Sequence, residues 1–153
     1  MEATSPPPPS GLLDGALHLF PVRVYYEDTD LSGMVYHANY LRWFERARSD
    51  LLRRLGIDQR AAAESGEGTY TVTELTVRYL APARLDDAVT IATSALELGA
   101  ASVRLRQRAS RDGELLADAS VRVGFISPGG RPRRQPAAWR AAFEAVLARK
   151  DPE

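Results

Sequence analysis

The feature that most constrains the fold is a series of four extended segments in the second half of the chain. Apolar and polar residues alternate along them with a period of two, which is typical of strands that bury one face. Gly99 and the pair Asp112-Gly113 are turn residues that suit hairpins between neighbouring strands. Such short connections predict an antiparallel sheet. The segments cover approximately residues 69–80, 87–98, 101–111 and 114–127.

A long amphipathic helix is predicted before these strands. Its apolar residues recur at steps of three and four, while arginine and glutamate occupy much of the remainder, so one face of the helix is expected to be buried. Gly56 marks its C-terminal end, because glycine readily adopts the left-handed conformation that follows many helices. The apolar positions are Tyr40, Phe44, Ala47, Leu51 and Leu55.

Two further elements flank this core. A first strand is predicted through Val22, Val24 and Tyr26, which alternate with more polar residues. The spacing of apolar residues from Pro136 to Arg149 predicts a short closing helix.

The order of these elements predicts the fold class and the domain boundaries. Residues 1–18 contain a run of four prolines and are expected to form a disordered leader. Residues 19–149 are expected to form one α+β domain, in which an antiparallel sheet of about five strands carries the long helix on one face. The apolar parity of the strand over residues 69–80 shifts near Thr73-Glu74, which predicts a β-bulge there.

Composition excludes several kinds of chemistry. The chain has no cysteine, so disulfides and thiolate nucleophiles are absent, and the histidines, His18 and His37, lack the spacing of a zinc site. No serine lies in a Gly-x-Ser-x-Gly elbow. The 20 basic and 20 acidic residues cancel, so no nucleic-acid partner is expected. No apolar run approaches the roughly 20 residues of a membrane span. We expect a cytoplasmic protein without metal or cofactor, whose chemistry depends on carboxylates.

The densest polar cluster lies where the first strand meets the long helix. It contains Asp28 and Asp30, and His37 follows at the start of the helix. Unpaired amides in the first turn of a helix carry positive partial charge and can polarise a carbonyl group that faces such a carboxylate. The residues taken alone leave other roles open: turn formation or helix capping for the aspartates, a metal site of the Asp-x-Asp kind, capping or packing for His37, and packing for Tyr26.

Longer motifs around this cluster resemble a known family. The runs Arg23-Val24-Tyr25-Tyr26-Glu27-Asp28-Thr29-Asp30, Val35-Tyr36-His37-Ala38-Asn39-Tyr40, Phe44-Glu45-Arg46-Ala47-Arg48 and Ala81-Pro82-Ala83-Arg84-Leu85-Asp86-Asp87 are similar to the signature of the Tol-Pal-associated acyl-CoA thioesterases, relatives of 4-hydroxybenzoyl-CoA thioesterase. The resemblance covers about residues 20–145. One departure is Leu31-Ser32, where relatives often carry small residues or proline.

This resemblance implies a hotdog fold, in which a curved antiparallel sheet wraps a long central helix and subunits pair into dimers or tetramers. It implies hydrolysis of acyl-CoA thioesters, with Asp30 as the catalytic carboxylate and Asp28 as support. His37 and Tyr26 match the family's histidine and tyrosine. Whether Asp30 acts as nucleophile or as general base stays open.

Coenzyme A carries phosphates, so arginines are expected near the mouth of the site. The candidates are Arg84, Arg131 and Arg133, with Arg134 beside them. The alternative hypothesis is a non-catalytic module of a cell-envelope complex that binds acyl thioesters or acyl carrier protein. A hotdog dehydratase is a third reading, and acyl carrier protein is also a possible substrate carrier.

Overall fold

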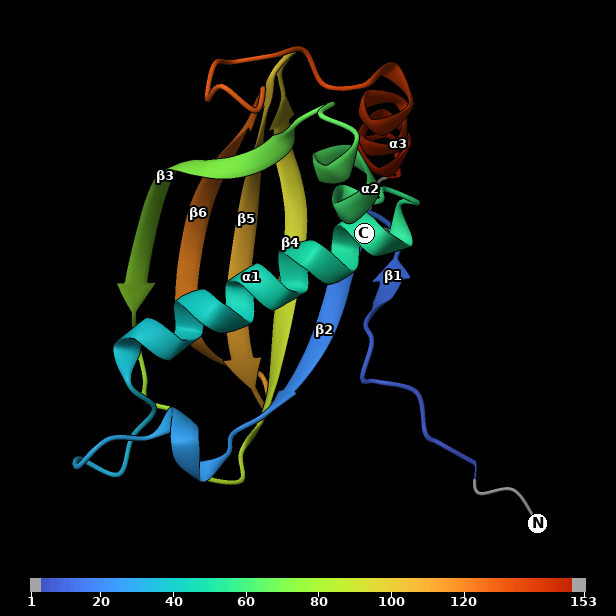
Figure 1. Cartoon of the computed structure of the whole chain (residues 1–153). Helices are drawn as coiled ribbons and strands as arrows, with labels where there is room; N and C mark the ends of the chain where they lie inside the picture. Colours follow the sequence, from blue (N-terminus) through green and yellow to red (C-terminus); the bar gives the residue numbers. More distant parts are fainter. Residues whose placement is uncertain (1–3, 150–153) are drawn as a thin grey trace.

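The long helix α1 lies across one face of an antiparallel sheet in the computed structural model, which describes residues 4–149 (Figure 1). The sheet has the strand order β1-β2-β4-β5-β6-β3, and α2 and α3 lie together near one end of it. The elements are β1 Leu12–Asp14, β2 Leu17–Arg23, the 3-10 helix η1 Tyr26–Asp28, α1 His37–Arg54, α2 Gln59–Glu64, β3 Thr69–Tyr79, β4 Ala88–Leu98, β5 Ser102–Arg111, β6 Glu114–Ile126 and α3 Ala137–Leu147.

The predicted arrangement is confirmed at the level of the sheet and its helix. All neighbouring strands within residues 4–149 are antiparallel. The number of strands is corrected, because the sheet has six strands and not about five. The additional strand is β1, which forms a hairpin with β2.

The expected leader over residues 1–18 was too long. Leu12–Asp14 and Leu17–Arg23 are strands, and His18 is completely buried. The Nε2 atom of His18 lies 2.7 Å from Oδ2 of Asp50 on α1, and the amide of Gly11 donates to the same oxygen over 3.0 Å. Polar contacts with a distant helix hold this segment, and apolar periodicity cannot reveal such contacts.

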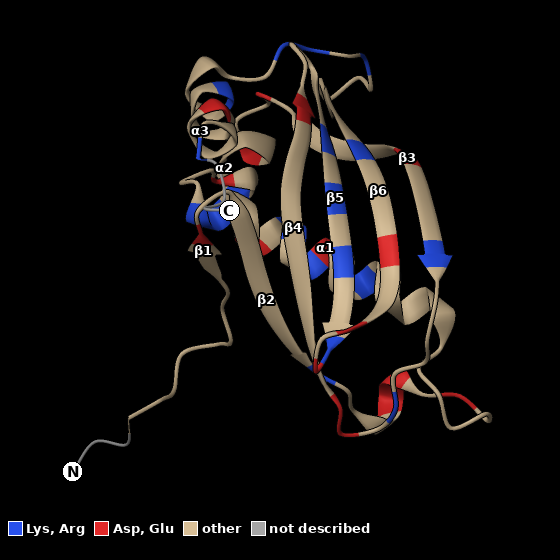
Figure 2. Ribbon diagram, turned by 180° about the vertical axis from the view of Figure 1, so that it is seen from behind, with Lys and Arg blue, Asp and Glu red and all other residues tan. Residues whose placement is uncertain are grey.

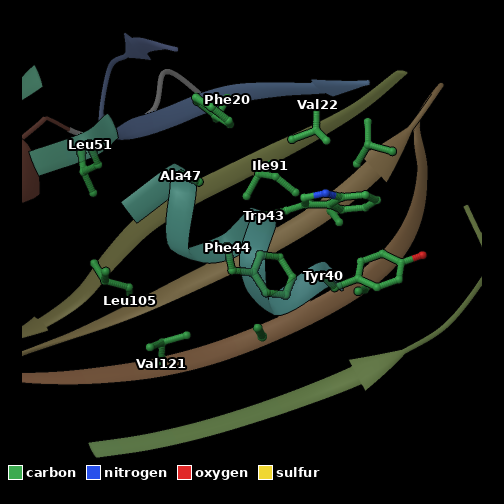
Figure 3. Packing of buried hydrophobic residues seen from close by; sticks show 14 of the residues in the cluster. Phe20, Val22, Tyr40, Trp43, Phe44, Ala47, Leu51, Ile91, Leu105 and Val121 are labelled. Atoms are coloured by element: carbon green, nitrogen blue, oxygen red, sulfur yellow. The ribbon is translucent and has the colours of Figure 1, made fainter. Parts of the chain in front are cut away.

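The buried face of α1 packs on the inner face of the sheet (Figure 3). Tyr40, Phe44, Ala47 and Leu51 are buried as predicted, whereas Leu55 is only partly buried. Burial of a large apolar side chain contributes roughly 1.5–3 kcal/mol, so this face largely fixes α1 on the sheet. Further labelled core residues are Phe20, Val22, Trp43, Ile91, Leu105 and Val121.

Local signals in the sequence match the backbone closely. Gly56 has a φ of 78° directly after the last residues of α1, as a C-terminal glycine should. The register of β3 against β6 shifts between Val72 and Glu74, where the bulge was predicted. Asp112 and Gly113 both have positive φ, 49° and 80°, and join β5 to β6.

The other face of the sheet is charged. Arg104, Arg106 and Arg108 alternate along β5 with buried residues, so their side chains lie on that face; basic residues are marked along β5 in Figure 2. Arg106 makes two hydrogen bonds to Asp118 on β6, of 3.3 and 3.0 Å. Across residues 4–149, none of the helices has both the length and the apolar character that crossing a membrane requires.

Candidate active site

The segment between β2 and α1 is folded around the buried carboxylate of Asp28. One of its oxygens accepts a hydrogen bond from the amide of Tyr25 (2.8 Å), and the other accepts one from the side-chain amide of Asn39 (2.8 Å). The amide of Tyr36 donates to the backbone carbonyl of Asp28 (2.8 Å). Asp28 therefore ties the end of β2 to the start of α1, which is the structural role that its sequence context left open.

Tyr26 lies outside any strand, so the predicted extension of the first strand through this residue was wrong. The amide of Tyr25 donates a hydrogen bond to the Asp28 carboxylate, and Tyr25 is the residue that precedes η1. The chain therefore leaves the strand before Tyr26. The side chain of Tyr26 is 82% exposed, and its backbone carbonyl accepts hydrogen bonds from the amide and hydroxyl of Thr29 (3.0 and 2.8 Å).

Asp30 occupies an exposed turn immediately before α1. Its amide donates to the carbonyl of Met34 (3.0 Å), and its carbonyl accepts from the amide of Gly33 (3.0 Å), which has a φ of 78°. The carboxylate accepts a hydrogen bond from the amide of Ser32 (2.8 Å) and another from its hydroxyl. These bonds, together with the positive charge of His37, lower the pKa of Asp30. The carboxylate is therefore ionised at neutral pH.

Ser32 contacts the candidate catalytic carboxylate, which the sequence analysis did not predict. There Leu31-Ser32 was only a departure from the family motif, yet the Ser32 hydroxyl donates a hydrogen bond to Asp30. A serine two residues after an aspartate commonly bonds it in a turn, and that spacing was the available signal.

His37 is the first residue of α1, and Tyr79 holds its backbone. The hydroxyl of Tyr79, at the end of β3, donates to the carbonyl of His37 (2.9 Å). The imidazole ring lies edge-on to the Tyr79 ring, with centroids 6.1 Å apart, and 4.6 Å from the ring of Tyr36. Among residues 4–149, no side chain caps the start of α1. The amide of Asn39 donates to the carbonyl of Tyr36 (2.9 Å), and the amides of His37 and Ala38 before it are available to a ligand beside Asp30.

Arg84 belongs to the same end of the molecule as Asp30. The amide of Val35 donates to the carbonyl of Ala83 (2.9 Å), and Met34 and Arg84 form an isolated β-bridge. The loop after β3 thus runs alongside the Asp30 turn. The Arg84 side chain is exposed, and its amide donates to Oδ2 of Asp87 (2.8 Å), which is the largest cause of the lowered pKa of Asp87.

Arg131 and Arg133 lie at the opposite end of the sheet. Their loop follows β6 and is the upper loop in Figure 1, whereas the Asp30 turn is at the bottom. The Nη1 atom of Arg133 donates to the carbonyls of Gly66 (3.2 Å) and Glu67 (2.7 Å), just before β3 begins. The two ends of β3 are separated by about 34 Å at 3.4 Å per residue. Within one chain these arginines are not brought to Asp30.

The arrangement supports acyl chemistry that depends on a carboxylate. An ionised carboxylate, a histidine and uncapped helix amides lie together at the end of the sheet. The described part of the chain has no group of three or more histidine, aspartate or glutamate side chains able to hold a metal. Such a site can place a base or nucleophile and a carbonyl-polarising group on opposite sides of an acyl carbon.

Comparison with known proteins places the chain in a family. Residues 24–147 match the model of the thioesterase-like superfamily. The acyl-CoA thioesterase YbgC of Haemophilus influenzae is 41% identical over 125 residues, which cover 81% of this chain and 92% of the relative. The acyl-CoA thioester hydrolase YbgC of Escherichia coli is 39% identical over 134 residues, which cover 86% and 99%.

A solved structure agrees with these relatives. The probable thioesterase of Bartonella henselae is 37% identical and superposes with a TM-score of 0.76, over 79% of this chain and 100% of that chain. The six-stranded antiparallel sheet with its single long helix is the hotdog arrangement. The chain belongs to the thioesterase-like superfamily of hotdog proteins.

Proposed function

We propose that this protein hydrolyses the thioester bond of acyl-CoA substrates, releasing the free acid and coenzyme A, with Asp30 as the catalytic carboxylate. The observation that carries the proposal is the ionised Asp30 carboxylate at the uncapped start of α1. Membership of a thioesterase family and the activity named for the relatives from Haemophilus influenzae and Escherichia coli agree with it.

The mechanism follows from this juxtaposition. The thioester carbonyl oxygen faces the first amides of α1, which stabilise the negative charge that develops there by about 3 kcal/mol per donor. Asp30 either attacks the carbonyl carbon and forms a mixed anhydride that water then cleaves, or removes a proton from an attacking water. The leaving thiol has a pKa of about 8.5, so it departs without a strong acid. Water supplies the hydroxyl of the acid and the proton of the thiol.

We assign supporting roles to His37 and Tyr26. The His37 ring stands on the first turn of α1, and its charge already influences Asp30, so it is suited to orient the carboxylate or the water. The exposed Tyr26 ring is suited to contact the substrate or a second copy of the chain. Arg84, on the loop beside the Asp30 turn, is suited to bind phosphates of coenzyme A.

A second copy of the chain would bring Arg131 and Arg133 to this site. β3 is an edge strand of the sheet, and Val72, Leu75 and Tyr79 on its inner side are 43%, 39% and 46% exposed. An exposed apolar edge favours pairing with another strand. Antiparallel pairing of two β3 strands would set the first residues of one beside the last residues of the other. The arginine loop of one copy would then lie beside the Asp30 turn of its partner.

We therefore propose a homo-oligomer, either a dimer or a tetramer, in which arginines of two copies bind coenzyme A. The cytoplasmic location, an association with a Tol-Pal system and the use of acyl carrier protein thioesters belong to the same proposal, and they derive from the resemblance of the motifs around Asp30. Each requires its own measurement in the cell.

Thiol release from a panel of acyl-CoAs tests the activity. The panel contains short aliphatic, long aliphatic and 4-hydroxybenzoyl esters, and free coenzyme A is counted against free acid. We expect turnover on at least one class, with equal amounts of both products. Absence of turnover on all of them and on acyl carrier protein thioesters would instead favour the non-catalytic binding module.

A further inference from the structure

A cavity of about 260 Å³ lies between α1 and the inner face of the sheet, away from the Asp30 turn. Half of its wall is apolar, with residues from α1, β3, β5, β6 and α3, including Leu52, Val72, Val123 and Phe143. Arg48, on the second half of α1, contributes a guanidinium group to this wall. A charged group beside apolar side chains in a cavity can orient a ligand.

The Arg48 side chain is held from inside the core. Its Nη1 donates to Oε1 of Gln107 (2.9 Å). Gln107 is completely buried, and its Nε2 donates to the carbonyl of Phe44 (2.9 Å) and lies 3.0 Å from the hydroxyl of Thr93. Because these partners fix the orientation of the Gln107 amide, the guanidinium has a defined position at the cavity wall.

Within residues 4–149 the guanidinium of Arg48 forms no ion pair, although the charge of Glu45, three positions earlier on α1, partly opposes the effect of burial on its pKa. Among residues 4–149, no carboxylate oxygen lies within 4.0 Å of its nitrogens. Burial lowers the pKa of Arg48, but an arginine stays protonated at neutral pH. Glu45 also lines the cavity, yet it is exposed to solvent. A partly buried cation that lacks a close anion gains from a ligand that supplies one.

An apolar strip leads from the candidate active site to this cavity. Tyr79, which bonds the carbonyl of His37, begins the strip, and Leu75 and Val72 continue it along the inner side of β3. All three are more than a third exposed, so α1 leaves this side of the strand uncovered. Val72 is itself part of the cavity wall.

We propose that the cavity binds the distal end of the acyl group and that Arg48 selects acyl chains that end in a carboxylate. The proposal rests on the thioesterase function above and names the substrate class within it. The apolar strip accommodates the methylene chain, and the guanidinium donates charge-assisted hydrogen bonds to the terminal carboxylate.

Matched pairs of substrates test this selection. The kcat/KM values of adipoyl-CoA and hexanoyl-CoA, of suberoyl-CoA and octanoyl-CoA, and of sebacoyl-CoA and decanoyl-CoA are compared. A charged hydrogen bond contributes roughly 1.5–3 kcal/mol, so we expect the carboxylate ester to be favoured by about tenfold or more at the chain length that reaches Arg48. A ratio of one or less at every length in the unmodified protein would overturn the proposal.

The Arg48→Met variant tests whether the preference for the carboxylate ester depends on Arg48. It removes the charge but keeps an apolar side chain of similar length, and we expect the ratio to fall to about one. Arg42→Met is the matched control, because Arg42 is an exposed arginine on the same helix outside this cavity, and it should keep the ratio. An Arg48→Met protein that is folded by circular dichroism and keeps the full ratio would contradict the assignment to Arg48.

Binding separates this proposal from the catalytic one. Calorimetric titration of the same pairs of esters into Asp30→Asn protein measures the Arg48 contact without turnover. Preferential binding of the carboxylate ester supports the proposal even if Asp30 is not catalytic. Equal dissociation constants for both members of every pair would overturn it, whatever the hydrolysis assay gives.

Discussion

At the scale of single residues, the contact between Ser32 and Asp30 lowers the pKa of the candidate catalytic group. The amide and hydroxyl of Ser32 both donate to the carboxylate, and the hydroxyl bond is the largest cause of the lowered pKa of Asp30. The hydroxyl also competes with substrate or water for the same oxygen. Ser32 therefore adjusts both the protonation and the availability of Asp30.

Replacing Ser32 with alanine should move the acid limb of the pH profile. Loss of the hydroxyl bond raises the pKa of Asp30, so the ionised form disappears at a higher pH as the solution is acidified. We expect the midpoint of the acid limb of kcat/KM to shift to higher pH, measured by thiol release across the acid range. Ser65→Ala, at the exposed end of α2, should leave this midpoint in place. An unshifted limb in Ser32→Ala would show that Asp30 does not control it.

The sequence predicted which types of residue gather at this site, but not which residues contact them. The run from Tyr26 to His37 was singled out because carboxylates precede a helix. The bonds that decide individual roles came only with the fold, since Asp28 meets Asn39 and His37 meets Tyr79 across separate elements. Arg48 was missed as well, because its partner Gln107 is 59 positions away.

At the scale of elements, a substitution at Gly56 tests the effect of backbone conformation on stability without a change in side-chain packing. It has a φ of 78°, and a methyl group added there would meet no atom within 4 Å. Gly56→Ala should therefore lower the free energy of unfolding by about 1 kcal/mol through left-handed strain alone. Urea unfolding measures this change.

Gly129→Ala is the matched control for that prediction. Gly129 has no positive φ, and an added methyl group would meet the Ser127 hydroxyl oxygen at an ordinary 3.7 Å. Its free energy of unfolding should stay within about 0.5 kcal/mol of the unmodified protein. Equal losses in the two variants would contradict a conformational origin.

Elements were predictable where a local signal dominates. The apolar stripe of α1 and the Asp112-Gly113 turn depend on neighbouring residues, and both were found from the sequence. β1 was missed because three residues are too few to display a period, and the hairpin it forms is fixed instead by the contact of His18 with Asp50. The end of β2 was predicted too late in the chain. Apolar and polar residues continue to alternate after Arg23, but the hydrogen bond between the Tyr25 amide and Asp28 turns the backbone away from the strand.

At the scale of the whole molecule, one complete proposed site needs two copies of the chain. Arg131 and Arg133 lie by the start of β3, and Asp30 lies near its end. No pattern in one sequence could place them together, because their meeting depends on how β3 pairs with a second strand. The proposed pairing makes a prediction about mixed oligomers.

Mixing two inactive or impaired variants should restore activity. Asp30→Asn protein keeps the arginine loop, and Arg131→Ala/Arg133→Ala protein keeps the carboxylate. When they are refolded together, half of the dimers combine both variants, and one of their two sites is intact, so about a quarter of all sites should turn over with an unmodified KM. Thiol release at low substrate concentration measures this.

The mixing experiment is interpreted with two comparisons: the kinetics of the arginine variant alone, and the average rate of the two separate variants. The Arg131→Ala/Arg133→Ala protein alone should show a raised KM with a smaller change in kcat, because it loses phosphate contacts. A mixture whose rate equals the average of its separate components would contradict a shared site.

The most direct test of the central claim is the rate of thiol release by Asp30→Asn protein on the best acyl-CoA of the panel. We expect turnover nearly to disappear while the circular dichroism melting curve is retained, because the exposed Asp30 side chain contributes little to the fold. Glu27→Gln, at an exposed position in the same segment, removes a similar charge and should keep its activity. An Asp30→Asn protein that retains most of its turnover would contradict the assignment of Asp30 as the catalytic carboxylate.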